Sequence, residues 1–308
     1  MTILQVLGVT AAYCVAGWLG LREQLVRGQV TPLWPPTGIA VAALLLLGVR
    51  VWPGITLGAL LVNAPLGAPP LATLAIIVGN TLSPVCASLL LRRVGFRGTL
   101  VRLRDALALV FLGALAGMLI SATVGTAALV LTGAVPESAF WETWSVWWAG
   151  DAMGVLVCAP ALFALRWARP PRLAHAYGWV ELAVLVAVAV ILAFVATASV
   201  PNLLFLLFPC LIWSAFRFEL AGAALCALVT CIVVVVRATF RVGLFAHFNL
   251  FKEMALLQAF NGSVALTALL LASVVAERNR AYEEIERVCA RLSAGIGRGR
   301  TDGGNAEP

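Results

Sequence analysis

Long apolar runs, separated by short polar connections, make up most of the chain. They cover residues 3–20, 36–48, 53–64, 70–91, 106–132, 145–166, 179–198, 201–216, 221–236 and 255–276. A helix that crosses the bilayer needs about 20 apolar residues, and the second, third, eighth and ninth runs are clearly shorter than that. The pattern predicts an all-α polytopic membrane protein, a bundle of 8–10 transmembrane helices that includes short or broken helices.

Residues 34–64 hold the most distinctive part of this pattern. The sequence Trp-Pro-Pro-Thr-Gly begins the first short run, and Arg50 with Trp-Pro-Gly at residues 52–54 separates it from the second. Non-helical backbone at membrane depth is tolerated where it is buried in protein or lines a cavity. We therefore expect a broken helix pair that lines a cavity. The number of full spans falls to eight if this pair, or residues 201–236, forms a re-entrant hairpin.

The distribution of arginine predicts the orientation. Two loops are rich in arginine, at positions 92, 93, 97, 102 and 104 and at positions 166, 169 and 172, whereas the loop 133–144 carries Glu137 and Glu142 and no basic residue. Cytoplasmic loops carry an excess of Lys and Arg, so the alternation of spans places both termini in the cytoplasm. Residues 237–253 carry three basic residues yet fall outside, and their phenylalanines predict a segment resting on the outer membrane surface.

The chain becomes polar after Ala276. We expect an integral membrane domain at residues 1–276, a cytoplasmic helical extension at residues 277–292 and a disordered tail at residues 293–308. Within the extension, a short apolar stripe has heptad-like spacing and consists of Ala281, Ile285, Val288 and Leu292. A helix this short is marginal alone, so the stripe suits docking on a partner helix or pairing inside a homodimer. The alternative is an amphipathic end lying on the lipid headgroups.

Composition supports the membrane assignment and excludes several functions. The chain is 62% hydrophobic and 11% charged, against about 25% charged residues in soluble domains. Its net charge of +7 reflects topological arginines rather than nucleic-acid binding. The seven cysteines form no Cys-x-x-Cys pair, the two histidines are isolated, and no nucleotide-binding or hydrolase motif occurs. We expect no enzyme activity, no metal and no cofactor.

Asp151 is the most informative single residue. It lies between Gly150 and Gly154 in the sequence WWAGDAMG, just after Trp144, Trp147 and Trp148, and tryptophans mark membrane interfaces. An acid inside a span normally faces a cavity or a partner. Both glycines leave room for a neighbouring backbone, and the start of the broken helix at Thr37 is the nearest plausible one. Asp151 either caps the N–H groups of that helix or contacts a ligand, and both readings remain open.

Two asparagines are further candidates. Asn80 lies near the middle of its predicted span, and Asn63 lies near the end of the preceding short run. Each could bind a polar ligand or form a hydrogen bond between helices. A separate set of small residues recurs every four positions and is best explained by close helix packing; it comprises Gly113, Gly117, Ser121 and Gly125.

Four segments together resemble the membrane-associated sensor domain of the first MASE type. They read WPPTGIAVAALLLLGVRVWPGITLGALLVN, GNTLSPVCASLLLRR, WWAGDAMGVLVCAPALFAL and WSAFRFELAGAALCAL, and the resemblance covers roughly residues 5 to 276. It implies a sensory domain of the bacterial inner membrane that normally precedes a histidine kinase, a diguanylate cyclase or a related cyclic-di-GMP enzyme. The family supplies no established ligand residues. Ser83 stands where the family commonly has Glu.

We therefore expect an integral membrane sensory domain. It would detect an unknown small ligand or a membrane state and signal to a separate cytoplasmic transmitter, in a two-component or cyclic-di-GMP system. No kinase or cyclase signature follows residue 292, so either the transmitter is a separate protein or the sequence is a piece of a longer chain. The alternative is a small-molecule transporter or permease, which broken helices and Asn80 would also suit. The candidate ligand contacts are Asp151, Trp34, Thr37, Asn63, Asn80 and Trp148.

Overall fold

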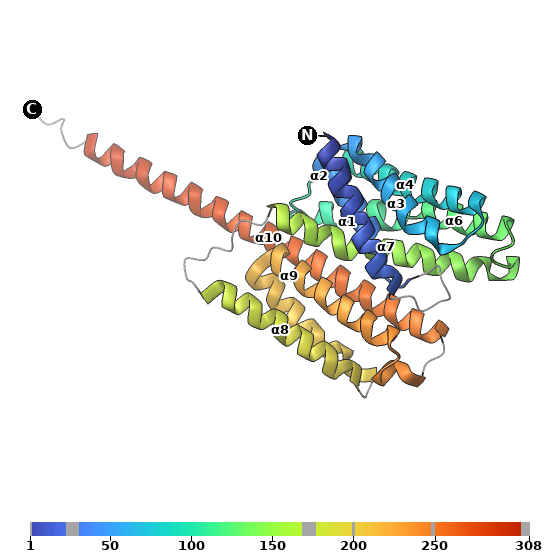
Figure 1. The fold of residues 1–308 in the computed structure, drawn as a ribbon. Helices are drawn as coiled ribbons and strands as arrows, with labels where there is room; N and C mark the ends of the chain where they lie inside the picture. The colour runs from blue at the N-terminus through green and yellow to red at the C-terminus, as the bar shows by residue number, and fades with distance from the viewer. Residues whose placement is uncertain (1, 23–30, 168–176, 199–200, 248–249, 303–308) are drawn as a thin grey trace, which may run out of the picture.

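The fold is a bundle of helices. A computed structural model describes residues 2–22, 31–167, 177–198, 201–247 and 250–302, and all regular elements in these ranges are helical (Figure 1). Eight of the described helical stretches are long and apolar enough to cross a membrane, and Pro35–Leu47 is a shorter apolar helix. The prediction of an all-α polytopic membrane protein with short or broken helices is confirmed.

The first three helices form the broken pair and its support. α1 (Thr2–Arg22) runs parallel to α3 (Trp52–Asn63), since Gly54 lies against Val6 and Gly58 lies against Tyr13. α2 (Pro35–Leu47) runs the opposite way and ends at Gly48, whose φ of 97° is accessible to glycine at little cost. A single 3-10 turn, η1 (Val49–Val51), then leads into α3. Prolines stand in the first turn of both short helices, where a helix tolerates them: Pro35 and Pro36 in α2, and Pro53 in α3.

The end of α2 is fixed by the next long helix. α4 (Pro70–Arg93) carries Arg92 in its last turn, and the Nη2 of Arg92 donates to the carbonyl oxygen of Leu44 at 2.6 Å. Carbonyls in the last turn of a helix lack partners within the helix. The Leu44 oxygen also accepts from the backbone N–H of Gly48 at 3.2 Å, so the arginine adds a second donor at the end of α2.

The fifth crossing changes its helical form along its length. It comprises α5 (Leu103–Ala108), the π-helical stretch η3 (Leu109–Ala116) and α6 (Leu119–Leu131). The carbonyl oxygen of Leu115, at the end of η3, accepts a hydrogen bond from the indole Nε1 of Trp148 at 2.8 Å. Wider helical turns weaken the regular ladder, and a tryptophan from a neighbouring helix satisfies a carbonyl there.

α7 (Phe140–Trp167) is the central helix of the bundle. It packs against α2, α6, α9 and α10, and its residues 150–160 are all buried. This stretch contains Asp151 and two glycines, so the helix that carries the acid also makes the closest helix contacts. Figure 1 shows α7 lying between the first helices and the α8–α10 group.

α9 (Leu207–Thr239) is two antiparallel halves. Glu219 has φ 52° and ψ −135°, which breaks the helix. η5 (Pro201–Leu206) follows the end of α8 (Tyr177–Ala198). In the first half of α9, Arg217 pairs with Glu181 near the start of α8. In the second half, Arg237 donates to Thr197 near the end of α8. The chain therefore goes out and returns along α8. With α2 and both halves of α9, the described chain crosses the bundle ten times.

Residues 237–253, predicted to rest on the outer membrane surface, are partly exposed and partly buried, and Phe240 is 73% exposed. Phe245 is fully buried, and Arg241 pairs with the buried carboxylate of Glu253 at 3.4 Å. Arg237 donates to the hydroxyl of Thr197 at 3.2 Å and lies over the ring of Phe194. The two arginines are held by specific contacts, which explains why this segment departs from the arginine rule. Phe248 lies outside the described residues, and the described structure includes no side-chain placement for Phe251.

α10 (Leu250–Asp302) is the last and longest helix. Its buried residues end at Ala276, and beyond this point it projects away from the bundle (Figure 1). It continues ten residues past the predicted end of the helical extension at residue 292, into the stretch predicted as a disordered tail. Only isolated glycines interrupt that stretch, and none of its residues up to Asp302 is proline. The domain boundaries themselves remain a prediction.

Candidate functional site

The start of α2 lies directly on the backbone of α7. The amide N–H of Trp34 donates to the carbonyl oxygen of Gly150 at 3.0 Å. A Cβ atom on Gly154 would collide with the carbonyl oxygen of Trp34, and one on Gly150 would collide with that of Thr31. The prediction that the glycines beside Asp151 make room for the start of the broken helix is confirmed. We call residues 31–34 the rim segment.

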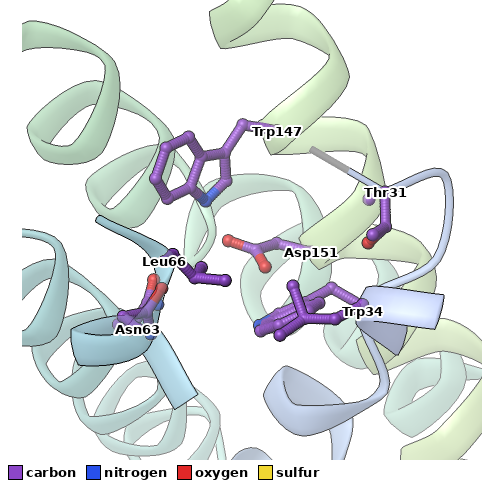
Figure 2. A pocket seen from close by; sticks show the side chains of 9 residues that line it. Thr31, Trp34, Asn63, Leu66, Trp147 and Asp151 are labelled. Carbon is purple, nitrogen blue, oxygen red and sulfur yellow. The ribbon is translucent and has the colours of Figure 1, made fainter. Parts of the chain in front are cut away.

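A cavity of about 30 Å³ opens beside this contact. Its walls come from the rim segment, α1, α3, α4 and α7, and they comprise Leu21, Thr31, Trp34, Asn63, Leu66, Asn80, Trp147, Gly150 and Asp151. Figure 2 shows the Asp151 carboxylate between the indoles of Trp34 and Trp147. A buried water needs about 10–15 Å³ by this measure, so the cavity has room for a few non-hydrogen atoms.

Asp151 sits in this cavity but does not cap α2. Its Oδ2 accepts a hydrogen bond from the hydroxyl of Ser121 at 2.5 Å, and its Oδ1 has no hydrogen-bond partner among the described residues. The Thr37 hydroxyl instead donates to the backbone oxygen of Asp151 at 3.1 Å and to that of Trp34 at 2.7 Å. The capping prediction is wrong because α2 is seated through backbone contacts, which leave the carboxylate turned away from the helix start.

The two asparagines meet in the cavity wall. The Nδ2 of Asn63 donates to the carbonyl oxygen of Ala59 at 2.8 Å, which leaves its side-chain oxygen and its second N–H for a ligand. Asn80 is 3% exposed and its Oδ1 has no partner among the described residues. Pro84 follows four residues later and has no N–H to donate, which also frees the backbone carbonyl of Asn80.

Four of the six predicted contacts line the cavity: Trp34, Asn63, Asn80 and Asp151. Thr37 lies one helical turn away and holds the rim in place rather than facing the space. Trp148 is not a lining residue, because its indole donates to Leu115 and stacks on Trp144 with ring centroids 5.7 Å apart. Trp147, one position earlier, lies on the cavity side of α7 instead.

Sequence reasoning missed several members of the site. Ser121 was assigned to a packing stripe of small residues, yet its hydroxyl is the hydrogen-bond donor to Asp151. The other stripe positions do pack closely: a Cβ on Gly117 would meet Ala87, and one on Gly125 would meet Trp147. The only signal that distinguishes Ser121 from the glycines of the stripe is its hydroxyl, since a buried hydroxyl usually has a hydrogen-bond partner. Tyr13, fully buried near Asp151 and Trp34, was also missed.

The described residues hold no group of three or more His, Cys, Asp and Glu side chains that could ligate a metal. The cavity instead combines one carboxylate, two side-chain amides and two indoles. Carbonyl and carboxylate oxygens accept hydrogen bonds, and indole faces attract cations. Its chemistry is therefore that of a small polar binding site.

α10 contacts the rim segment beside the cavity and the opposite end of the bundle. The Nε2 of Gln258 donates to the carbonyl oxygen of Pro32 in the rim segment at 3.0 Å. Farther along the same helix, the hydroxyl of Ser273 donates to the carbonyl oxygen of Leu100 at 2.8 Å, and a carboxylate oxygen of Glu277 accepts from the N–H of Leu103 at 3.2 Å. One rigid helix thus links the cavity to the connection between α4 and α5.

These features define a multi-pass membrane protein with a small polar cavity at one end and a long projecting helix at the other. The chain matches the MASE1 family over residues 4–279 and belongs to it. No curated protein sequence and no solved structure matches it. MASE1 is a family of membrane-associated sensory domains rather than catalytic ones, which supports a role as a membrane sensor.

Proposed function

We propose that the protein senses a small polar ligand in the cavity beside Asp151 and signals through α10 to a separate cytoplasmic transmitter. The observation that carries this proposal is the hydrogen bond from Gln258 of α10 to Pro32 of the rim segment. Two rim residues, Thr31 and Trp34, line the cavity. A ligand that changes the position of the rim therefore acts on the helix that leaves the bundle.

Transmission along α10 needs a helix that moves as a unit. Between Gln258 and Ser273 the described helix is continuous, which corresponds to about 22 Å at 1.5 Å per residue. Gly262 is the only glycine of that stretch, and no proline interrupts it. A displacement at the rim therefore reaches Leu100 and Leu103, on the far side of the bundle. For the signal to exist, the ligand must bind the two positions of α10 unequally.

The projecting part of α10 offers a surface for the transmitter. Tyr282, Ile285 and Val288 are each about half exposed or more, and they lie three residues apart along the helix. This spacing places apolar side chains close to one helical face. A helix of a histidine kinase or a diguanylate cyclase, or a second copy of the chain, would cover that face. The arginine rule places this segment in the cytoplasm of a bacterial inner-membrane protein.

The experiment uses Ile285→Ser with Val288→Ser, which removes the apolar face but leaves the membrane part unaltered. The control is Glu284→Ser, which changes an exposed polar residue on the same helix. We expect the double variant to insert normally and to lose co-purification with the cognate kinase or cyclase, whereas the control keeps it. A double variant that retains its partner and every signalling response would contradict the proposal. Uptake of a substrate into vesicles would favour a permease instead.

A further inference from the structure

Two buried oxygens in the cavity wall have no hydrogen-bond donor among the described residues. Oδ1 of Asp151 and Oδ1 of Asn80 have no partners in the described structure, and both residues are almost completely buried, at 1% and 3% exposure. Asn63 adds a side-chain oxygen, and its amide nitrogen already donates one hydrogen bond to Ala59. Buried polar atoms are rarely left unpaired. The unpaired oxygens favour a ligand that donates hydrogen bonds. The buried hydroxyl of Tyr13, near Asp151, is also unpaired, but Tyr13 is not one of the residues that line the cavity.

The cavity also has an unmet requirement for positive charge. A buried carboxylate is costly unless a charge or several hydrogen bonds compensate it. Ser121 supplies one hydrogen bond to Asp151, and no described basic side chain forms an ion pair with it. None of the nine described lining residues is basic. Two lining residues, Trp34 and Trp147, carry indoles, whose faces attract cations.

We propose that the cavity binds a small cation bearing N–H donors, namely ammonium or a short primary alkylammonium. This rests on the proposed ligand site and names its chemistry. The volume of about 30 Å³ has room for ammonium or methylammonium. The N–H groups of either cation would donate to Asp151, Asn80 and Asn63, which all line the cavity. Potassium has the charge and a similar size but no N–H groups, and tetramethylammonium has the charge but neither the size nor the donors.

The test is a binding titration of the purified full chain in nanodiscs at constant ionic strength and pH. Intrinsic tryptophan fluorescence and the midpoint of thermal unfolding are followed against ammonium, methylammonium, potassium and tetramethylammonium chlorides, with sodium chloride as the balancing salt. We expect saturable fluorescence changes and raised midpoints with the first two salts alone. A response to potassium or tetramethylammonium equal to that of ammonium, or no saturable response to ammonium, overturns the inference.

Variants assign the binding to the cavity. Asp151→Asn should weaken methylammonium binding at least tenfold, and Asn80→Leu should weaken it severalfold; either variant suffices if the other does not fold. The matched control is Asp105→Asn, which alters another buried acid, about 24 Å along the α5–α6 crossing from Ser121. Unchanged affinity in folded Asp151→Asn would contradict the assignment. The coupling between the rim segment and α10 can be tested without any ligand, by a distance measurement on rim variants. A failure of the cation inference therefore does not decide the coupling proposal.

Discussion

Gln258 and Pro32 are 226 positions apart in the chain and are joined by a hydrogen bond of 3.0 Å from the side-chain Nε2 to the backbone oxygen. Pro32 belongs to the short segment that seats α2 on α7, and Gln258 belongs to the helix that leaves the bundle. The contact therefore connects the cavity with the exit helix by a single side chain. It explains how a small cavity near one end of a membrane bundle can influence a helix whose exposed part begins at the other end.

Gln258→Leu removes this connection while keeping a side chain of similar size. We expect a loss of about 1 kcal/mol in the free energy of unfolding, because a neutral hydrogen bond is lost and the Pro32 oxygen is left without it. Any response of the partner protein to the ligand should weaken more than this modest loss explains. The control is Ser263→Ala, an exposed residue of the same helix whose hydroxyl bonds only within the helix. Equal signalling by both variants would count against the role of Gln258.

Gly154→Ala tests the seating of α2 on α7. A Cβ there would collide with the Trp34 oxygen and lie 2.5 Å from Oγ1 of Thr37. We expect the free energy of unfolding to fall by about 1–3 kcal/mol, as is typical of overpacking. Thermal or denaturant unfolding in detergent measures this change. Gly8→Ala is the matched control in α1, where no atom lies within 4 Å of the new Cβ; it should be neutral or raise stability by up to about 1 kcal/mol. Equal effects of the two changes would show that the close contact is not as tight as described.

Asp151 and Ser121 should behave as a coupled pair. Ser121→Ala and Asp151→Ala each remove the 2.5 Å hydrogen bond. We expect each change to lower the free energy of unfolding by about 1.5–3 kcal/mol, as for hydrogen bonds to charged groups. Asp151→Asn should be milder because an amide oxygen still accepts from Ser121. A double-mutant cycle, read by unfolding in detergent, should give a coupling energy of about 1 kcal/mol or more. Strictly additive losses would mean that the two side chains do not interact.

The orientation is tested by reporter fusions. The arginine rule places residue 295 in the cytoplasm and residue 137 outside. A fusion after Gly295 should be active with a cytoplasmic reporter, and one after Glu137 with a periplasmic reporter. The described structure places the start of α7 and the projecting end of α10 on opposite sides of the bundle (Figure 1). Periplasmic activity after Gly295 would reverse the orientation and the side from which a ligand reaches the cavity.

Much of the fold was predictable from the sequence because hydrophobic runs report membrane helices directly. The broken pair at residues 34–64 and the contact between Gly154 and the start of α2 followed from proline, glycine and run length. The break at Glu219 was only partly predictable, since a glutamate at φ 52° carries no residue-type signal comparable to that of glycine. Side-chain partners across helices were less predictable still, because they depend on helix rotation.

The cavity illustrates this limit. Four predicted residues line it. The sequence predicts Trp148 as a contact, but Trp147 lines the cavity instead. Neighbouring positions on a helix point about 100° apart, and spacing alone does not fix which of them faces inward. The role of Asp151 as a cap was wrong for a related reason. Its backbone, not its carboxylate, faces the start of α2. Ser121 and Gln258 became visible only once the packing of distant helices was known.

The central claim is that the position of the rim segment sets the position of the exit helix. It is tested most directly by the distance between spin labels at Arg93, at the end of α4, and Arg280, on the exit helix, in a background with the seven cysteines replaced. Gly150→Ala displaces the rim, because the new Cβ would collide with the Thr31 oxygen; Gly8→Ala is the control. We predict a shift of about 1–2 Å in the mean distance for Gly150→Ala, the scale of helix shifts in switching proteins, and none for the control. An unchanged distance in a folded Gly150→Ala protein whose tryptophan fluorescence shows a displaced rim would contradict the account.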